Sequence, residues 1–176
     1  MEIKMDRPPR TAMEVFKLLP EGTLCEVIEN QLYMAPPPSD SHQKASVILL
    51  LQIGNYILEN DLGEVRHAPY GVFLDEENAV EPDLIFLTKE RLHLIQKDGI
   101  HGAPDIIVEI LSPNNRKYDS ITKRNLYEKF GVKEYWIVDP ETKLATGYEW
   151  KEGKYYELGT STATLPSKLL RQTFSF

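Results

Sequence analysis

Two apolar runs in the middle of the chain are too uniformly hydrophobic to alternate between a core face and a water face. Residues 83–87 read Asp-Leu-Ile-Phe-Leu, and residues 106–111 read Ile-Ile-Val-Glu-Ile-Leu. Runs of this kind predict strands that are covered on both faces. Each run nevertheless carries one carboxylate, Asp83 or Glu109. Because burying an unpaired carboxylate costs on the order of several kcal/mol, we expect a cation or hydrogen-bond donors beside each of them.

The rest of the hydrophobic pattern predicts alternating helices and strands. Ser39–Asp40–Ser41 can cap a helix that runs to about Asn60. Its predicted buried side consists of Val47, Leu50, Leu51, Gly54 and Leu58. Other helices are expected at 11–19, 89–96 and 120–130, and strands at 24–28, 32–35, 135–138, 144–150 and 155–158. Residues 65–74 are expected to form either a strand pair or one bent strand, broken at Pro69 and Gly71. Residues 1–176 are therefore predicted to form one mixed α/β (α+β) domain, with a central mixed β-sheet flanked by helices and with additional N-terminal and C-terminal hairpins.

Composition places the chain among ordinary globular proteins. A length of 176 residues with 41% hydrophobic and 27% charged residues is enough for a core without covalent staples. The single cysteine, Cys25, excludes an internal disulfide and offers no ligand spacing for a structural zinc. The most apolar stretch, 45–58, is too short for a membrane span, and no secretory segment is recognised. We therefore expect a cytoplasmic protein without a membrane partner.

The charge balance limits the class of partner. A net charge of −7 argues against strong, indiscriminate nucleic-acid binding, which needs a positive field. Residues 116–133, however, contain six basic and two acidic side chains. This segment is either a local positive face or simply a solvated helix surface.

Strand geometry narrows the set of carboxylates that could share one ion. Asp105 and Glu109 point to the same face of one strand but lie roughly 13 Å apart, which is too far. Asp83 would lie only about 5 Å from Glu109 if the two strands are neighbours. A shared Mg²⁺ would then be feasible. Alternatively, Asp83 caps a turn after Pro82, and Glu109 pairs with a buried base.

One lysine is predicted to point inward. Lys123, Leu126, Tyr127 and Phe130 recur at three- and four-residue spacing on the predicted helix 120–130, so Lys123 lies on or beside its buried stripe. An inward ammonium needs an anion, which the two carboxylates or a substrate phosphate would supply. The alternative is a lysine whose stem covers apolar surface while its charge stays in water.

Several blocks of the sequence resemble a known family. Residues 80–84, 102–113, 119–123, 127–132 and 134–140 are similar to the Uma-two restriction endonuclease family, a branch of the PD-(D/E)XK nuclease superfamily. The similarity extends from about Cys25 to Tyr156. It implies a restriction-endonuclease-like core and a Mg²⁺ or Mn²⁺ ion held by Asp83, Glu109 and the backbone carbonyl of Ile110.

The resemblance also carries further site residues. The superfamily lysine usually stands two residues after the glutamate, where this chain has Leu111, and in this family it maps onto the next helix at Lys123. Glu26 matches a family block and could extend the metal shell. His42 matches another block and could contact a phosphate or help to cap its helix. Tyr127 is a third possible additional site residue.

These observations predict a metal-dependent endonuclease that hydrolyses DNA. Asp83, Glu109 and Lys123 would be the catalytic residues, with Lys123 positioning the attacking water. The side chains expected to contact the DNA backbone are Arg116, Lys117 and Arg124. A homodimer is expected, because a duplex has two strands to cut. Two alternatives stay open: an inactive binding module with internally paired carboxylates, or a metal-dependent hydrolase of RNA or nucleotides.

Overall fold

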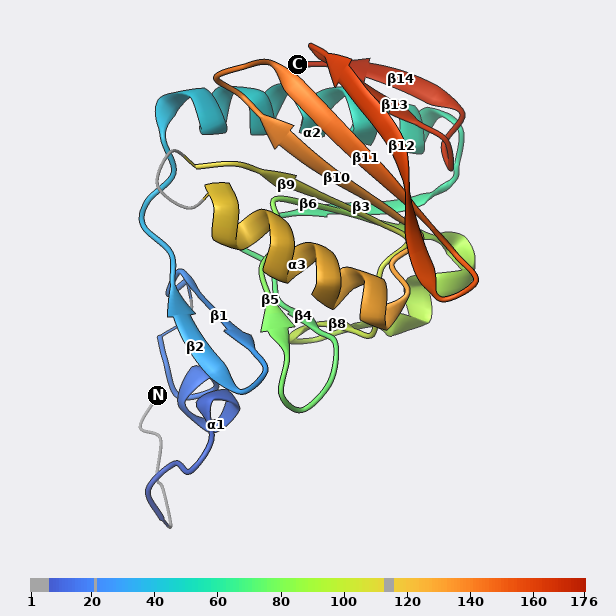
Figure 1. Cartoon of the computed structure of the whole chain (residues 1–176). Coiled ribbons are helices and arrows are strands. Elements are labelled where there is room, and N and C mark those ends of the chain that lie inside the picture. The colour runs from blue at the N-terminus through green and yellow to red at the C-terminus, as the bar shows by residue number, and fades with distance from the viewer. Residues whose placement is uncertain (1–6, 21, 113–115) are drawn as a thin grey trace.

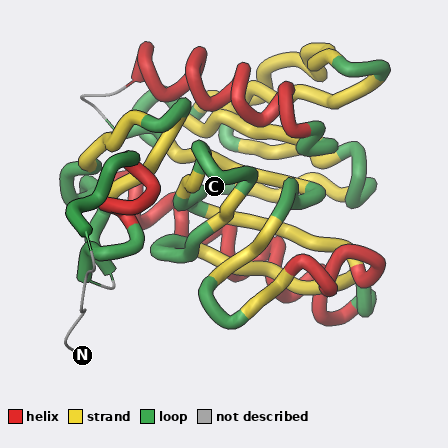
Figure 2. The backbone as a smooth tube through the Cα atoms, turned by 90° about the horizontal axis from the view of Figure 1, so that it is seen from below, coloured by secondary structure: helices red, strands yellow, loops and turns green. Residues whose placement is uncertain are grey.

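The main sheet is six-stranded and lies between two long helices. The computed structural model describes residues 7–20, 22–112 and 116–176, with side chains for all of these except 116–120. The strand order is β12-β11-β10-β9-β6-β3, and only β9 and β10 run parallel. The strands are β3 (Gly63–His67), β6 (Leu84–Thr88), β9 (Ile106–Ile110), β10 (Glu134–Asp139), β11 (Leu144–Lys151) and β12 (Lys154–Thr162). Helices α2 (Asp40–Glu59) and α3 (Arg116–Phe130) cover opposite faces of this sheet (Figures 1 and 2).

Alternation along β6 and β9 divides the interior into two cores. The core on the α2 side contains Leu84, Phe86, Ile106, Val108 and Ile110. The core on the α3 side contains Ile85, Leu87 and Ile107 together with Leu126 and Tyr127 of α3. Because successive strand residues point to opposite faces, Asp83 and Glu109 both belong to the α3 side.

A second sheet lies beside the main one, below α3 in Figure 1. Its strand order is β2-β1-β5-β4-β8-β7. The strands are β1 (Cys25–Ile28), β2 (Gln31–Met34), β4 (Val72–Phe73), β5 (Ala79–Val80), β7 (Ile95–Gln96) and β8 (Gly99–His101). Glu29 and Asn30 join β1 to β2 with positive φ angles of 51° and 56°, a combination that suits the twist of a tight hairpin. The predicted mixed α/β fold with a central mixed sheet flanked by helices is confirmed, and this second sheet accompanies it.

Smaller elements close the ends of the fold. The remaining elements are α1 (Ala12–Phe16), the 3₁₀ helix η1 (Lys89–Leu94), and a C-terminal hairpin of β13 (Thr164–Ser167) and β14 (Gln172–Ser175). Leu165, Phe174 and Phe176 from this C-terminal segment complete the core under α2. Along the described ranges, no helix combines the length and the apolar character needed to cross a membrane.

The predicted bounds of α2 are confirmed, but its predicted buried side is only partly right, since Gly54 is buried and Leu50 packs against the core, whereas the other three residues are exposed. The Ser39 side chain caps the helix by accepting from the His42 backbone N–H, and Asn60 ends it. The core takes the row Ala45, Leu49, Ile53 and Ile57 instead. Val47, Leu51 and Leu58 are 51%, 58% and 73% exposed. The error arises because α2 has apolar residues on two sides, and helical spacing alone does not show which side meets the sheet.

Other predicted elements differ in extent, α3 and the β11–β12 hairpin among them. α3 begins at Arg116 rather than near Ser120, because its first turn is polar and carries no hydrophobic period. The hairpin predicted at 144–150 and 155–158 is confirmed and longer, with Glu152 and Gly153 at its turn. Strand β10 pairs with β11 along the whole length of β10, and this pairing buries Trp136 against Gly147.

We expect Gly147→Ala to destabilise the fold. A Cβ at this position would lie 2.4 Å from the ring of Trp136, which is completely buried. Overpacking of this kind costs about 1–3 kcal/mol. Urea unfolding followed by tryptophan fluorescence measures the change in the free energy of unfolding.

Gly54→Ala provides the matched control for this experiment. Gly54 lies inside α2, and the nearest atom to an added Cβ would be a Val65 methyl group at 3.6 Å, an ordinary contact. Alanine in a helix interior should raise stability by about 0.5–1 kcal/mol. Equal stability of wild type and Gly147→Ala would contradict the packing described for Trp136.

Candidate active site

The two carboxylates of the predicted site stand on neighbouring strands. β6 and β9 are antiparallel, with Leu84 opposite Val108. One further step in this register places Asp83 opposite Glu109. The backbone N–H of Ile110 donates to Asp83 Oδ2 at 2.7 Å, so the Asp83 side chain takes over a ladder hydrogen bond where β6 begins. The predicted adjacency of these strands is confirmed.

His42 holds the other oxygen of Asp83. Its Nε2 lies 3.1 Å from Asp83 Oδ1, and the side chain is 9% exposed. The His42 backbone N–H also donates to Ser39 Oγ at the start of α2. His42 therefore belongs both to the helix cap and, through its ring, to the carboxylate site. Its buried Nδ1 has no hydrogen-bond partner among the described residues.

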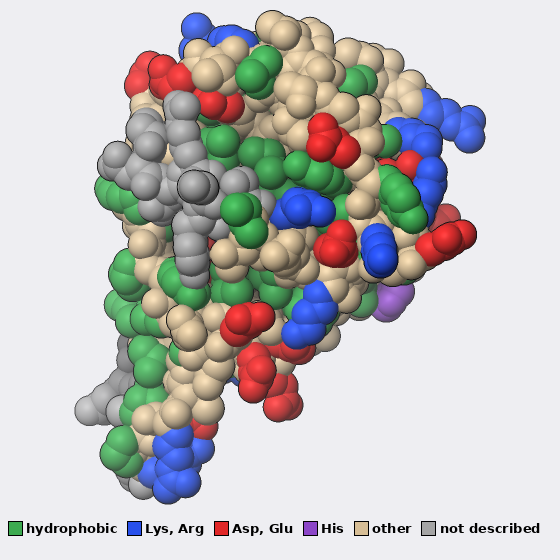
Figure 3. All heavy atoms as spheres, in the orientation of Figure 1, with side chains coloured by type: hydrophobic (Ala, Val, Ile, Leu, Met, Phe, Trp, Pro, Cys, Tyr) green, Lys and Arg blue, Asp and Glu red, His purple; other side chains and the backbone are tan. Residues whose placement is uncertain are grey.

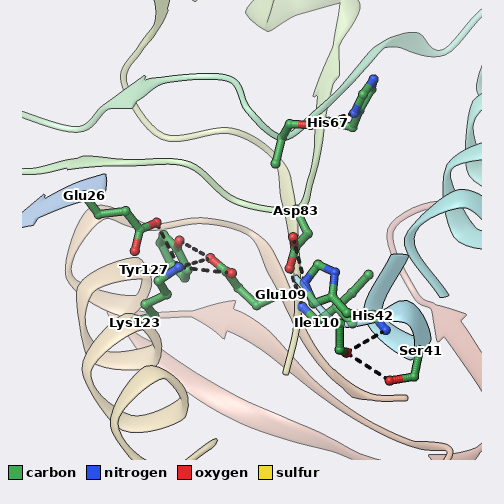
Figure 4. A network of polar contacts seen from close by, with 11 residues as sticks. Glu26, Ser41, His42, His67, Asp83, Glu109, Ile110, Lys123 and Tyr127 are labelled. Carbon is green, nitrogen blue, oxygen red and sulfur yellow. Dashed lines mark hydrogen bonds and ion pairs between the residues drawn. The ribbon is translucent and has the colours of Figure 1, made fainter. Parts of the chain in front are cut away.

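Glu109 is held by two side chains of α3. Lys123 Nζ lies 3.1 Å from each Glu109 oxygen, and the Tyr127 hydroxyl donates to Oε1 at 2.6 Å. Lys123 and Tyr127 are four residues apart, so both project from the same side of the helix. Figure 4 shows the Glu109 carboxylate turned toward this pair, while the Asp83 carboxylate faces His42 and Ile110. The predicted inward orientation of Lys123 is confirmed, since its side chain is only 9% exposed.

Glu26 reaches this group from the second sheet. Lys123 Nζ donates to Glu26 Oε1 at 2.8 Å, and the backbone N–H of Glu81 donates to the same oxygen at 2.9 Å. Lys123 therefore joins α3, the main sheet and the second sheet at one point (Figure 4).

The sequence analysis missed one acidic residue of this site. Glu81 lines the same cleft as Glu26 and Asp83. Burial and the neighbouring charge of Glu26 raise its pKa to about 7, and Lys123 opposes this shift. The sequence signal that could have identified Glu81 was its two-residue spacing from Asp83, because residues two apart in an extended segment point to the same side.

The charged groups of the site shift one another's pKa. Burial raises the pKa of Glu109, with Glu26 and Asp83 adding to the shift and Lys123 opposing it. Burial alone would lower the pKa of Lys123, but Glu109 and Glu26 outweigh it and raise the pKa above its ordinary value. Lys123 is therefore a permanent ammonium among several carboxylates, and the site carries an excess of negative charge.

This donor set fits a hydrated divalent cation. Within residues 7–20, 22–112 and 116–176, no three His, Cys, Asp or Glu side chains form a ready-made metal cluster. Asp83 and Glu109 could supply one carboxylate oxygen each. The Ile110 carbonyl is a third candidate, because in a strand the N–H and C=O of one residue point to the same side, here toward Asp83. Mg²⁺ commonly uses one or two carboxylates and keeps several waters, so this set suits it.

The carboxylates line a cleft of about 470 Å³ between the two sheets and α2. Its polar lining includes Glu26, His42, Glu81, Asp83, Glu109 and Lys123. Its other lining residues are mainly apolar, from β2, α2 and the connector between them. One part of the cleft lining is therefore charged, and the other part is apolar.

Two other residues considered in the sequence analysis, Asp105 and Arg124, are not among those that line the cleft. Asp105 is buried outside the cleft, where its carboxylate pairs with Lys133 at 2.6 Å, so its exclusion from the ion site is confirmed. The guanidinium of Arg124 lies 5.1 Å from the centre of the Tyr148 ring and does not line the cleft. Arg116 and Lys117 begin α3, but their side chains lie outside the described residues. The DNA contacts assigned to these three residues stay predictions.

Comparison with known proteins places this site in a family. The family model Uma2, described as "Putative restriction endonuclease", matches residues 12–175. A search of curated proteins found no match. Among solved structures, "a putative nuclease belonging to DUF820" from Anabaena variabilis ATCC 29413 is similar with a TM-score of 0.75 and 19% sequence identity, over 93% of this chain and 92% of that one. At this identity the likeness shows a common fold. Since the family model spans almost the whole sequence, the chain belongs to the Uma2 (Uma-two) family, whose description is that of a restriction endonuclease.

Proposed function

We propose that this protein is a divalent-metal-dependent endonuclease that hydrolyses phosphodiester bonds of DNA. The observation that carries the proposal is the pairing of Asp83 and Glu109 on adjacent strands, with the Lys123 ammonium 3.1 Å from both Glu109 oxygens. Family membership supports nuclease chemistry. The proposal also includes backbone contacts to DNA from Arg116, Lys117 and Arg124.

In this proposal Asp83, Glu109 and the Ile110 carbonyl would hold Mg²⁺ or Mn²⁺. When bound, such an ion lowers the pKa of water and polarises a phosphoryl oxygen. The protein contributes carboxylates that are already oriented. His42 and the Ile110 N–H fix Asp83, and Tyr127 fixes Glu109. Preorientation matters because groups that must reorganise during the reaction stabilise charge less well.

Lys123 has a separate role in the proposal. Its ammonium stays protonated and lies beside the carboxylate that faces the cleft. A fixed positive donor at this position can orient an attacking water and offset negative charge that develops on the phosphoryl oxygens. A lysine on the following helix thus provides the cation that Leu111 cannot provide on the strand.

We expect Mn²⁺ to bind with both carboxylates as ligands. Calorimetric titration of the wild type should show binding, and Asp83→Asn and Glu109→Gln should each weaken it at least about ten-fold, since even outer-shell changes commonly cost this much. Glu157→Gln is the matched control, because it removes an exposed carboxylate of β12 that does not line the cleft. Unchanged binding in Glu109→Gln would contradict the assignment.

We expect Lys123→Met to slow cleavage at least about a hundred-fold, which is the usual effect of losing a donor to transition-state charge. Mn²⁺ binding should persist, because the ammonium competes with the ion for Glu109. Lys129→Met is the control, since Lys129 is exposed on the same helix and its ammonium lies over the Phe130 ring. Cleavage of plasmid and of single-stranded DNA in Mn²⁺ measures the rate, and circular dichroism confirms folding. Full activity of Lys123→Met would remove that lysine from the mechanism.

The same assay with RNA of matched sequence tests the assignment of DNA as substrate. DNA should be cleaved and RNA should remain intact. Preferential cleavage of RNA would instead support the alternative hydrolase. Failure of the wild type to cleave either polymer would overturn the proposed activity.

A further inference from the structure

The catalytic groups proposed above are enclosed. The side chains of Lys123, Glu109, Glu26 and Asp83 are between 9% and 15% exposed. The cleft volume of about 470 Å³ falls in the size range of small-molecule sites. We expect an unpaired strand to bring its phosphate to these groups more readily than a stiff B-form duplex, because the groups lie inside a cleft of this size. An unstacked nucleotide can enter such a cleft.

One wall of the cleft is suited to a nucleobase. Tyr33 stands directly opposite Glu26 in the β1–β2 register, so both side chains lie on the same sheet face. From α2, Val47 and Leu50 line the cleft at helical spacing with Gln43 and Ser46. Pro36, Pro38 and Pro69 complete the apolar part. We call Tyr33, Val47, Leu50, Pro36, Pro38 and Pro69 the apolar wall.

Tyr33 lies where the apolar wall meets the charged residues of the cleft. Its cross-strand neighbour Glu26 accepts from Lys123, which also contacts Glu109. An aromatic ring therefore lies one side chain away from the carboxylate–lysine group. Base–aromatic stacking contributes about 1–3 kcal/mol per base and tolerates any sequence.

The described lining of the cleft provides little of the positive field that holds a duplex. Among the described residues that line the cleft, Lys123 is the one lysine or arginine, against Glu26, Glu81, Asp83 and Glu109. On the face in Figure 3, outside the grey atoms, basic side chains are scattered among acidic ones and form no continuous stripe. Duplex binding draws most of its affinity from many phosphate contacts. Stacking on the apolar wall supplies affinity without such a stripe.

We propose that the cleft receives an unpaired nucleotide of single-stranded DNA, whose base packs on the apolar wall while its phosphate reaches Lys123 and the cation site that Asp83 and Glu109 would form. This inference rests on the proposed nuclease function and names its substrate class. Strands with single-stranded ends, gaps or flaps would be cut, and fully paired duplex would be cut poorly.

Fluorescence anisotropy with labelled DNA tests the inference separately from catalysis. The protein carries Glu109→Gln, so that cleavage does not disturb the measurement, and binding is measured in Mg²⁺ and in EDTA. We expect a single-stranded oligonucleotide to bind at least about ten-fold more tightly than the same sequence as a blunt duplex. Tyr33→Ala should weaken single-strand binding about ten-fold, and Tyr33→Phe should restore it because the stacking ring is kept.

A second variant guards against a folding defect in Tyr33→Ala. Val47→Ser changes a side chain that is 51% exposed and lines the cleft, and it should weaken binding several-fold. Leu58→Ser is its matched control, since Leu58 is 73% exposed on the same helix and does not line the cleft. Equal or tighter binding of duplex would overturn the inference, as would unchanged binding in both Tyr33→Ala and Val47→Ser.

The two proposals fail in different ways. Single-strand binding through Tyr33 without cleavage by the wild type would overturn the nuclease function and leave the nucleotide site intact. Cleavage of duplex as fast as single strands, with loss of activity in Glu109→Gln, would support the nuclease and overturn the substrate class.

Discussion

One buried ammonium group connects the main parts of the molecule. Lys123 extends from α3 and donates to Glu109 in the main sheet and to Glu26 in the second sheet. A buried lysine without such partners would lose its hydration with nothing to replace it, and each carboxylate would face the same cost without the lysine. The junction between the two sheets therefore depends on charge compensation as well as on apolar packing.

Further contacts set the orientation of each carboxylate. Tyr127 holds Glu109 from the helix, and His42 together with the Ile110 N–H holds Asp83. The carboxyl groups of Glu26, Asp83 and Glu109 still outnumber the single ammonium of Lys123. Repulsion among these carboxylates destabilises the folded protein when no cation is bound. The same arrangement suits the site to a divalent cation, because a cation relieves that repulsion.

Helix α2 shows why apolar character on two sides need not be a folding defect. The row through Ala45, Leu49, Ile53 and Ile57 packs on the sheet, as a core helix requires. A second apolar side includes Val47 and Leu50, which line the cleft beside the carboxylates. Leu50 also packs against the core, whereas Val47 is half exposed, so the interpretation of Val47 belongs with ligand binding.

Local pattern was sufficient for the long helices, for the strands of the main sheet and for several site residues. Uniform apolar runs predicted the strands that carry Asp83 and Glu109, and helical spacing predicted that Lys123 points inward, because strand and helix periods assign each side chain to a face. The same periods could not choose between the two apolar sides of α2, nor separate one sheet from two. Those outcomes, and the meeting of Lys123 with Glu26 across 97 residues of sequence, follow from which surfaces pack together. Such pairings depend on the shape and charge of distant segments, and no local period in the chain encodes them.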